Sequence, residues 1–261
     1  MVGSVKLPTR VFDPSYGRRV IERRAWNCLE RCRNALGLGQ IQLPIPVEQW
    51  IESPLGFHFG FADLSYLGEG VLGATFIRER EILIDEQVID HDGRCRFTCA
   101  HELGHMLLHQ KVRPEFHETS DLGPGSDDMI EREADRFAAA FLMPLPLVEA
   151  EVIKVFDECR MDRVRCTWEL MQTTRESEWM WRKLLLPMLT RRFGVSLSTA
   201  INRCNDIEPR IPSPRPLLPA EFVESLLHRS VRGDELDAIR LRDGVPQYAD
   251  LFTPASSDPE Q

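Results

Sequence analysis

The chain has 261 residues, 43% of them hydrophobic, and a formal net charge of −9. This length is enough for a substantial core, and the negative charge means that any nucleic-acid-binding surface must be a local patch. No apolar run approaches the ~20 residues needed to cross a bilayer, and the first ten residues lack a secretory signal, so we expect a cytoplasmic protein without a membrane partner.

The first part of the chain is predicted to form two helices and three strands. In order, these are a helix over 16–36, a short helix over 44–51, a strand over 56–61, and strands over 71–78 and 81–86 joined by a tight turn. We expect the strands to form a small antiparallel sheet. The 71–78 strand is expected at an exposed edge, where an extended substrate backbone could pair with it.

The motif HELGH at 101–105 dominates the next segment. Apolar residues at three- and four-residue spacing predict a helix over 92–110, with Asp92 as its N-cap. On a helix the two histidines lie one turn apart, about 6 Å between Cβ atoms, where both can ligate one metal ion. Glu102 lies beside them and is the predicted catalytic residue, because it can take a proton from a metal-bound water.

A catalytic zinc site needs a third protein ligand and an open fourth position. We expect this ligand on a second predicted helix over 127–144. Helical geometry places Glu131 at the border of the buried stripe, and Glu133 roughly on the opposite, solvent-facing side. Asp135, one turn after Glu131, could orient a ligating histidine. The predicted ligands are His101, His105 and Glu131, with Glu133 as the alternative to Glu131.

These residues resemble the ImmA/IrrE family of zinc metallopeptidases. The resemblance rests on HELGH and on EREADRFAAAFLMP at 131–144, and it covers about residues 20 to 206. It includes the strands over 73–77 and 81–85 and the segment 192–196. Family members commonly have Asn in place of Asp135, a departure that leaves the metal site plausible.

The resemblance implies a zincin-like domain with two histidines and one glutamate on zinc. It also implies a bacterial or phage-related endopeptidase that cleaves a helix-turn-helix repressor and so induces genes, for example in a stress response. Zn²⁺ is the expected cofactor, although Mn²⁺ suits the same donors. A repressor or an antitoxin is the expected protein partner.

Three further polar residues are candidates for smaller roles. His109 continues the four-residue spacing of the motif and is expected to be a structural hydrogen-bonding residue. His117, in a predicted loop over 112–126, and Tyr66, in a loop over 62–70, are candidate hydrogen-bond donors to the transition state.

Seven cysteines without a C-x-x-C pair indicate buried thiols in a reducing compartment. Two pairs, Cys28 with Cys32 and Cys95 with Cys99, have helical spacing. Cys99 could be a redox-sensitive neighbour of the metal site, but plain packing is the simpler interpretation.

The rest of the chain is predicted to be mainly helical. Helices are expected over 145–158, 176–192 and 197–205, and residues 184–205 have helix-turn-helix character. Nearby basic residues support an alternative function as a DNA-binding regulator, and a catalytically silent interaction protein is a second alternative. These basic residues are Arg182, Lys183, Arg191, Arg192 and Arg203.

The expected fold class is therefore α+β, with a small antiparallel sheet packed on a helical core and a mainly helical C-terminal part. The predicted divisions are an N-terminal extension over 1–15, a metallopeptidase domain over 16–160, a helix-turn-helix-like segment over 161–206, a Pro-rich linker with a C-terminal helix over 207–252, and a disordered tail over 253–261. The C-terminal helix is expected at 220–241.

Overall fold

The computed structural model describes residues 16–119, 128–170, 172, 174–205, 239–242 and 245–248. The predicted extension 1–15 and tail 253–261 lie outside these residues, as does most of the segment 207–252. The helix expected over 220–241 is wrong at its end. Residues Ile239–Arg242 form strand β5, which pairs with β6 (Val245–Tyr248) in an antiparallel ladder.

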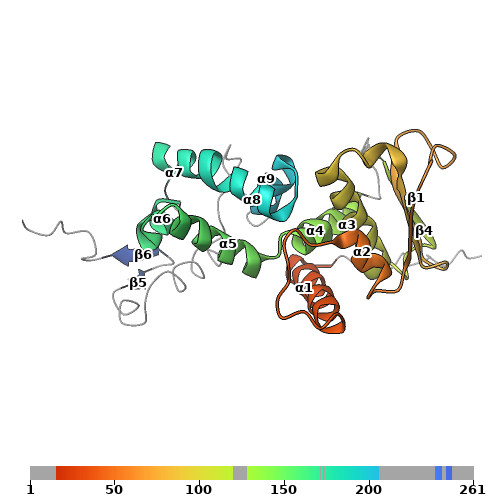
Figure 1. Cartoon of the computed structure of the whole chain (residues 1–261), viewed down its shortest axis with the longest axis horizontal. Helices are drawn as coiled ribbons and strands as arrows, with labels where there is room; N and C mark the ends of the chain where they lie inside the picture. Colours follow the sequence, from red (N-terminus) through yellow and green to blue (C-terminus); the bar gives the residue numbers. More distant parts are fainter. Residues whose placement is uncertain are drawn as a thin grey trace, which may run out of the picture.

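A four-stranded sheet occupies one end of the molecule (Figure 1). The strands are β1 (His58–Ala62), β2 (Val71–Phe76), β3 (Glu81–Asp85) and β4 (Glu115–Thr119), in the order β1-β3-β2-β4. Strand β2 runs antiparallel to β3 and β4, whereas β1 runs parallel to β3. The α+β class is confirmed, but the sheet is mixed, because the β2–β3 hairpin brings β3 rather than β2 beside β1.

The expected exposed edge strand is also wrong. Strand β2 pairs on both sides and is mostly buried, which suits its small and apolar residues. The edge beside it is β4, which lies in the segment that the sequence predicts to be a loop. That segment is rich in polar residues, so its extended conformation has no clear apolar pattern.

Two helices, α3 (Asp92–Leu108) and α4 (Asp128–Leu142), form the centre of the structure. Helix α3 packs against α4 on one side and against β2 and β3 on the other, so nearly all of its side chains from residue 95 onward are buried. Helix α1 (Arg18–Ala35) covers α4, and α2 (Val47–Glu52) covers the start of α3. A short 3-10 turn, η1 (Glu86–Val88), precedes α3. His91, not Asp92, occupies the N-cap position, and its side chain makes no capping hydrogen bond.

Two glycines allow α3 to approach its neighbours closely. A Cβ atom at Gly73 of β2 would lie 2.7 Å from Oε1 of Glu102 and 2.8 Å from a methyl group of Thr98. A Cβ atom at Gly104 would lie 3.2 Å from the Cα atom of Ala134 in α4. A side chain at Gly73 would force its neighbours to move, and one at Gly104 would make a tight contact with the backbone of α4. The two glycines hold the sheet, α3 and α4 close around the HELGH motif.

The C-terminal helices extend away from the sheet (Figure 1). They are α5 (Leu145–Glu158), α6 (Arg163–Leu170), α7 (Arg175–Trp179), the π-helical turn η2 (Met180–Leu185), α8 (Leu186–Phe193) and α9 (Leu197–Asn205). Residues 175–193 are thus continuously helical, as predicted for 176–192. Gly194 ends α8 in the left-handed conformation, and α9 returns to pack on α4.

Several of the basic residues of this segment form ion pairs within the chain. Arg192 pairs with Glu151 and Glu158, Arg203 pairs with Glu22, and Arg182 lies 3.2 Å from Glu178. Arg203 is also buried. These pairs remove much of the local positive charge on which the DNA-binding alternative depends. Among the described residues, no helix has the length and apolar character to span a membrane.

Candidate metal centre

Three atoms suited to metal binding converge between α3 and α4. Nε2 of His101 lies 3.0 Å from Nε2 of His105, and Oε2 of Glu131 lies 3.2 Å and 3.3 Å from these two nitrogens. Zinc bonds of about 2.0–2.1 Å in a tetrahedral arrangement place ligand atoms about 3.3 Å apart. The structure therefore brings together the three predicted ligands with separations that fit one zinc ion.

The hydrogen-bond partners of the two imidazoles support a cation at this point. Nδ1 of His101 lies 2.9 Å from Oδ1 of Asp135, so it carries the proton and donates. Nδ1 of His105 lies 3.1 Å from Nδ1 of His109. If His105 is the donor of this hydrogen bond, its proton also lies on Nδ1. Both Nε2 atoms then direct lone pairs toward each other and toward the Glu131 carboxylate. Three acceptors that face one another without a donor need a positive ion between them.

His101 is held by Asp135, as the sequence predicts. The Asp135 side chain is 40% exposed, whereas that of His101 is 2% exposed. Burial opposes protonation of His101, but the carboxylates of Glu118, Asp135 and Glu131 outweigh this effect and raise its pKa well above the ordinary value. This region therefore favours positive charge, whether carried by a proton or by a metal ion.

His105 is held by a longer chain of buried groups. His109 contacts His105 through Nδ1, and its Nε2 lies 3.1 Å from Oε2 of Glu133. Oε1 of Glu133 accepts a hydrogen bond of 2.5 Å from the backbone N–H of Tyr16. The ring of Phe116 stacks on the ring of His105 with 4.4 Å between centroids. The orientation of His105 is thus fixed both by hydrogen bonding and by stacking.

The position of Glu133 corrects the sequence prediction. Its side chain is 3% exposed rather than directed to solvent, because α1 packs over the face of α4 that carries it. Glu133 does not belong to the group of converging atoms, which includes Glu131 instead. The expected hydrogen-bonding role of His109 agrees with its two contacts.

Glu102 is buried beside these ligands and is hydrogen-bonded on one side only. Its Oε2 accepts a hydrogen bond of 2.5 Å from the Thr75 hydroxyl of β2. Its Oε1 is buried without a hydrogen-bond partner among the described residues. Burial raises the pKa of Glu102 to about 8, although the nearby His101 lowers it. A carboxyl group with one free, buried oxygen beside a metal site is suited to receive and return a proton.

Burial dominates at the other two histidines. It lowers the pKa of His105 to about 4 and that of His109 to about 3. Both imidazoles are therefore neutral at pH 7. Neutral imidazole is the form that binds a metal or relays a hydrogen bond.

Strand β4 brings a residue to the site that the sequence does not predict. A carboxylate oxygen of Glu118 lies within 4.8 Å of ligand-type atoms of His101 and Glu102. Burial raises the pKa of Glu118, and its Oε2 has no hydrogen-bond partner among the described residues. The sequence signal for this residue is weak, because β4 is short and mainly polar.

Neither of the two candidate transition-state donors belongs to the group of converging ligand atoms. His117 is adjacent to Glu118 on β4, and neighbouring side chains of a strand point to opposite faces of the sheet. Its ring lies 6.3 Å from that of Phe76 on β2, and its donor role stays a prediction. Tyr66 is 69% exposed in the loop before β2, and its donor role stays a prediction.

Comparison with known proteins supports this interpretation of the site. Residues 64–156 match the family described as Peptidase_M78, the IrrE N-terminal-like domain. This match confirms the resemblance to the ImmA/IrrE family for the segment that contains β2, β3, β4, α3 and α4. No curated protein matches the chain significantly. The matched segment is a metallopeptidase-type domain with a possible His/His/Glu metal site.

Proposed function

We propose that this protein is a zinc-dependent endopeptidase. The observation that carries the proposal is the convergence of His101 Nε2, His105 Nε2 and Glu131 Oε2 beside a buried carboxyl group with a free oxygen. A zinc ion bound by these three residues would activate a water molecule and polarise a peptide carbonyl group. Mn²⁺ also accepts imidazole and carboxylate ligands.

The residues of the chain have distinct roles in this mechanism. Glu102 takes the proton of the attacking water at its free Oε1 and later gives a proton to the leaving amine. The Thr75 hydroxyl holds Oε2 of Glu102, so the carboxyl group keeps one orientation during both transfers. Asp135 and His109 hold the two ligating imidazoles in the tautomers that leave Nε2 unprotonated.

We infer that the substrate is a protein, and that this protein is a helix-turn-helix repressor or an antitoxin. Support comes from the relation of residues 64–156 to a peptidase family and from the resemblance of the chain to ImmA/IrrE proteins. Cleavage would relieve repression. The ion pairs of Arg182, Arg192 and Arg203 favour this function over direct DNA binding by the segment 184–205.

The experiment that tests the proposal compares the wild type with Glu102→Gln. The neutral amide cannot accept the proton of water, so we expect zinc content to stay stoichiometric and cleavage of a candidate repressor to fall by about 10²–10⁴-fold. Zinc is measured by elemental analysis and cleavage by mass spectrometry of the products. A chelator should abolish cleavage by the wild type. Undiminished cleavage by Glu102→Gln would remove Glu102 from its proposed role.

A further inference from the structure

A second group of possible metal ligands lies at the start of α3, apart from the HELGH motif. It consists of Cys95 and Cys99 of α3 and Glu48 of α2, whose ligand atoms all lie within 4.8 Å of one another. The two cysteines are 7% and 0% exposed, and the Glu48 side chain is 29% exposed. None of these residues has a part in the proposed hydrolysis.

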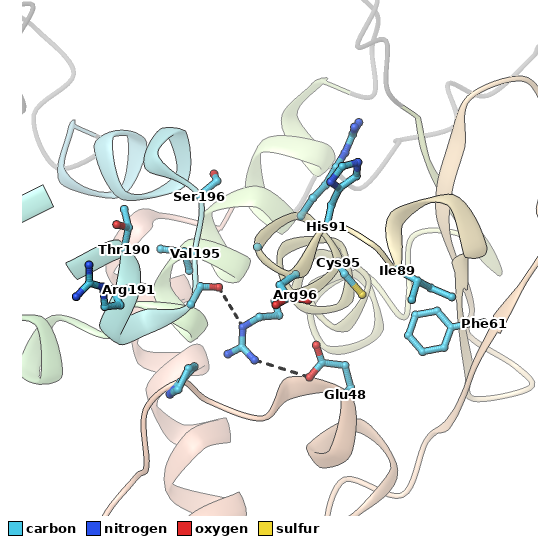
Figure 2. A pocket seen from close by; sticks show the side chains of 15 residues that line it. Glu48, Phe61, Ile89, His91, Cys95, Arg96, Thr190, Arg191, Val195 and Ser196 are labelled. Atoms are coloured by element: carbon cyan, nitrogen blue, oxygen red, sulfur yellow. Dashed lines mark hydrogen bonds and ion pairs between the residues drawn. The ribbon is translucent and has the colours of Figure 1, made fainter. Parts of the chain in front are cut away.

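Two members of the group, Cys95 and Glu48, line a pocket of about 890 Å³ between the α2–α3 region and the turn between α8 and α9. Figure 2 shows the sulfur of Cys95 and the carboxylate of Glu48 on the same side of this pocket, with Arg96 beside them. A cation can therefore reach Cys95 and Glu48 without unfolding of the core.

We propose that Cys95, Cys99 and Glu48 form a second metal site, selective for a thiophilic ion such as Zn²⁺. Two cysteines four residues apart lie on the same face of a helix, and two thiolates with a carboxylate are a donor set that zinc accepts. Zinc bonds of about 2.3 Å to sulfur and about 2.1 Å to oxygen hold ligand atoms under about 4 Å apart. Separations within 4.8 Å thus need only small side-chain rotations. On binding, each thiol releases its proton to solvent.

The other helical cysteine pair provides an internal comparison. Cys28 and Cys32 of α1 have the same four-residue spacing and are also buried. Among the residues that the structure describes, however, only the pair on α3 belongs to a group with a third ligand. The four-residue spacing of two cysteines is therefore explained by helix packing. The feature that indicates a metal site is the carboxylate of Glu48, which α2 contributes.

The charge balance of the site also favours a divalent ion. Two thiolates, one carboxylate and a divalent cation together keep one negative charge. Arg96 balances this charge, because its guanidinium lies 3.9 Å from the carboxylate of Glu48. The guanidinium is fixed by hydrogen bonds to the carbonyl oxygens of Gly194, at 3.1 Å, and Ile45. The fourth coordination position is left for water or a small ligand from the pocket.

Cobalt(II) distinguishes the two sites in the full-length protein, because only thiolate ligands give a sulfur-to-cobalt charge-transfer band in the near ultraviolet. We expect metal-free wild type to bind two cobalt ions per chain and to show this band. Cys95→Ser removes one of the two thiolates and should reduce the band by at least half, and Glu48→Gln should weaken it at equal cobalt concentration. Cys28→Ser is the matched control and should leave it unchanged. Glu131→Ala should remove one cobalt ion and keep the band, which separates this site from the HELGH site.

The absence of a charge-transfer band in the wild type would overturn the proposal. The same holds if the band keeps its full intensity in Cys95→Ser or disappears in Cys28→Ser. Circular dichroism shows whether each variant is folded. If Cys95→Ser is not, Glu48→Gln decides the question, because this residue is partly exposed and its substitution preserves shape. An unchanged band in folded Glu48→Gln then counts against the site.

Discussion

The two histidines of the HELGH motif are supported in different ways, although they lie one turn apart on α3. His101 is held by a single carboxylate, that of Asp135, which is 40% exposed. His105 is held by a buried chain that runs through His109 and Glu133 to the backbone of Tyr16. One support is in contact with solvent, and the other is part of the core.

This difference predicts unequal tolerance to substitution. Water can replace part of a lost hydrogen bond at an exposed site, whereas a group left unpaired in the core keeps its full desolvation cost. The buried chain also joins α3 and α4 to Tyr16, which lies two residues before α1, so it couples the orientation of His105 to the packing of these segments. The support of His105 should therefore be the more sensitive of the two.

The largest expected effect is on zinc binding, and it distinguishes the ligand Glu131 from the supporting residue Glu133. Glu131→Ala removes one of three converging ligand atoms, and we expect the protein to lose stoichiometric zinc. Glu133→Ala should retain zinc at saturating concentration, because it removes only an indirect support. Elemental analysis of both proteins after dialysis tests this difference. If Glu133→Ala loses the metal and Glu131→Ala retains it, the assignment of ligand and support is reversed.

A second test compares the two supports directly. Disruption of a group that orients a ligand typically weakens metal binding by about 10–100-fold. We expect His109→Leu to lie near the upper end of this range. Asp135→Asn should lie near the lower end, because Asn can still accept the proton of His101. Zinc affinity is measured by competition with a chromophoric chelator.

His109→Asn is the matched control for this comparison. Its side-chain oxygen can take the place of Nδ1 as an acceptor for His105, so it should recover part of the affinity that His109→Leu loses. A variant that acts only by disturbing the core would show no such recovery. Greater loss in Asp135→Asn than in His109→Leu would contradict the proposed ranking of the two supports.

The residues that the sequence predicts correctly are those that depend on one helix at a time. Four-residue spacing is enough to place two histidines on one face, and helical geometry is enough to prefer Glu131 over Glu133 as the converging residue. The environment of Glu133 depends on Tyr16, 117 residues earlier in the chain, and on the adjoining helix α1. A helical periodicity cannot show which of two faces a distant helix will cover.

The sheet was harder to predict for a related reason. Alternating residues indicate strands, but they do not indicate which strands pair, so the internal position of β2 and the parallel pairing of β1 with β3 were missed. Strand β4 was missed because its sequence is mainly polar. One of its polar residues, Glu118, lies close to His101 and Glu102. The polar character that made this strand hard to predict therefore includes a residue of the site.

The last predicted effect concerns the stability of the metal-free protein and the ionisation of Glu102, which lies between the two histidines in sequence. In metal-free protein its pKa is raised from an ordinary value of 4.5 to about 8, mainly by burial. The folded state therefore binds the proton more tightly than the unfolded state. This contribution to stability is complete below about pH 4.5 and is lost as the pH rises through about 8.

Glu102→Gln cannot ionise, so it should avoid this loss. We expect the melting temperature of the metal-free variant to rise relative to wild type as the pH increases from 5 to 9, by about 2–4 °C for each kcal/mol of avoided cost. The lowered pKa values of His105 and His109 act in the opposite direction, with stability lost as the pH falls below about 6.5, but they are common to both proteins. Thermal unfolding in chelator at pH 5, 7 and 9 tests the prediction. A difference in melting temperature that stays constant with pH would show that Glu102 does not carry the proton in the metal-free fold.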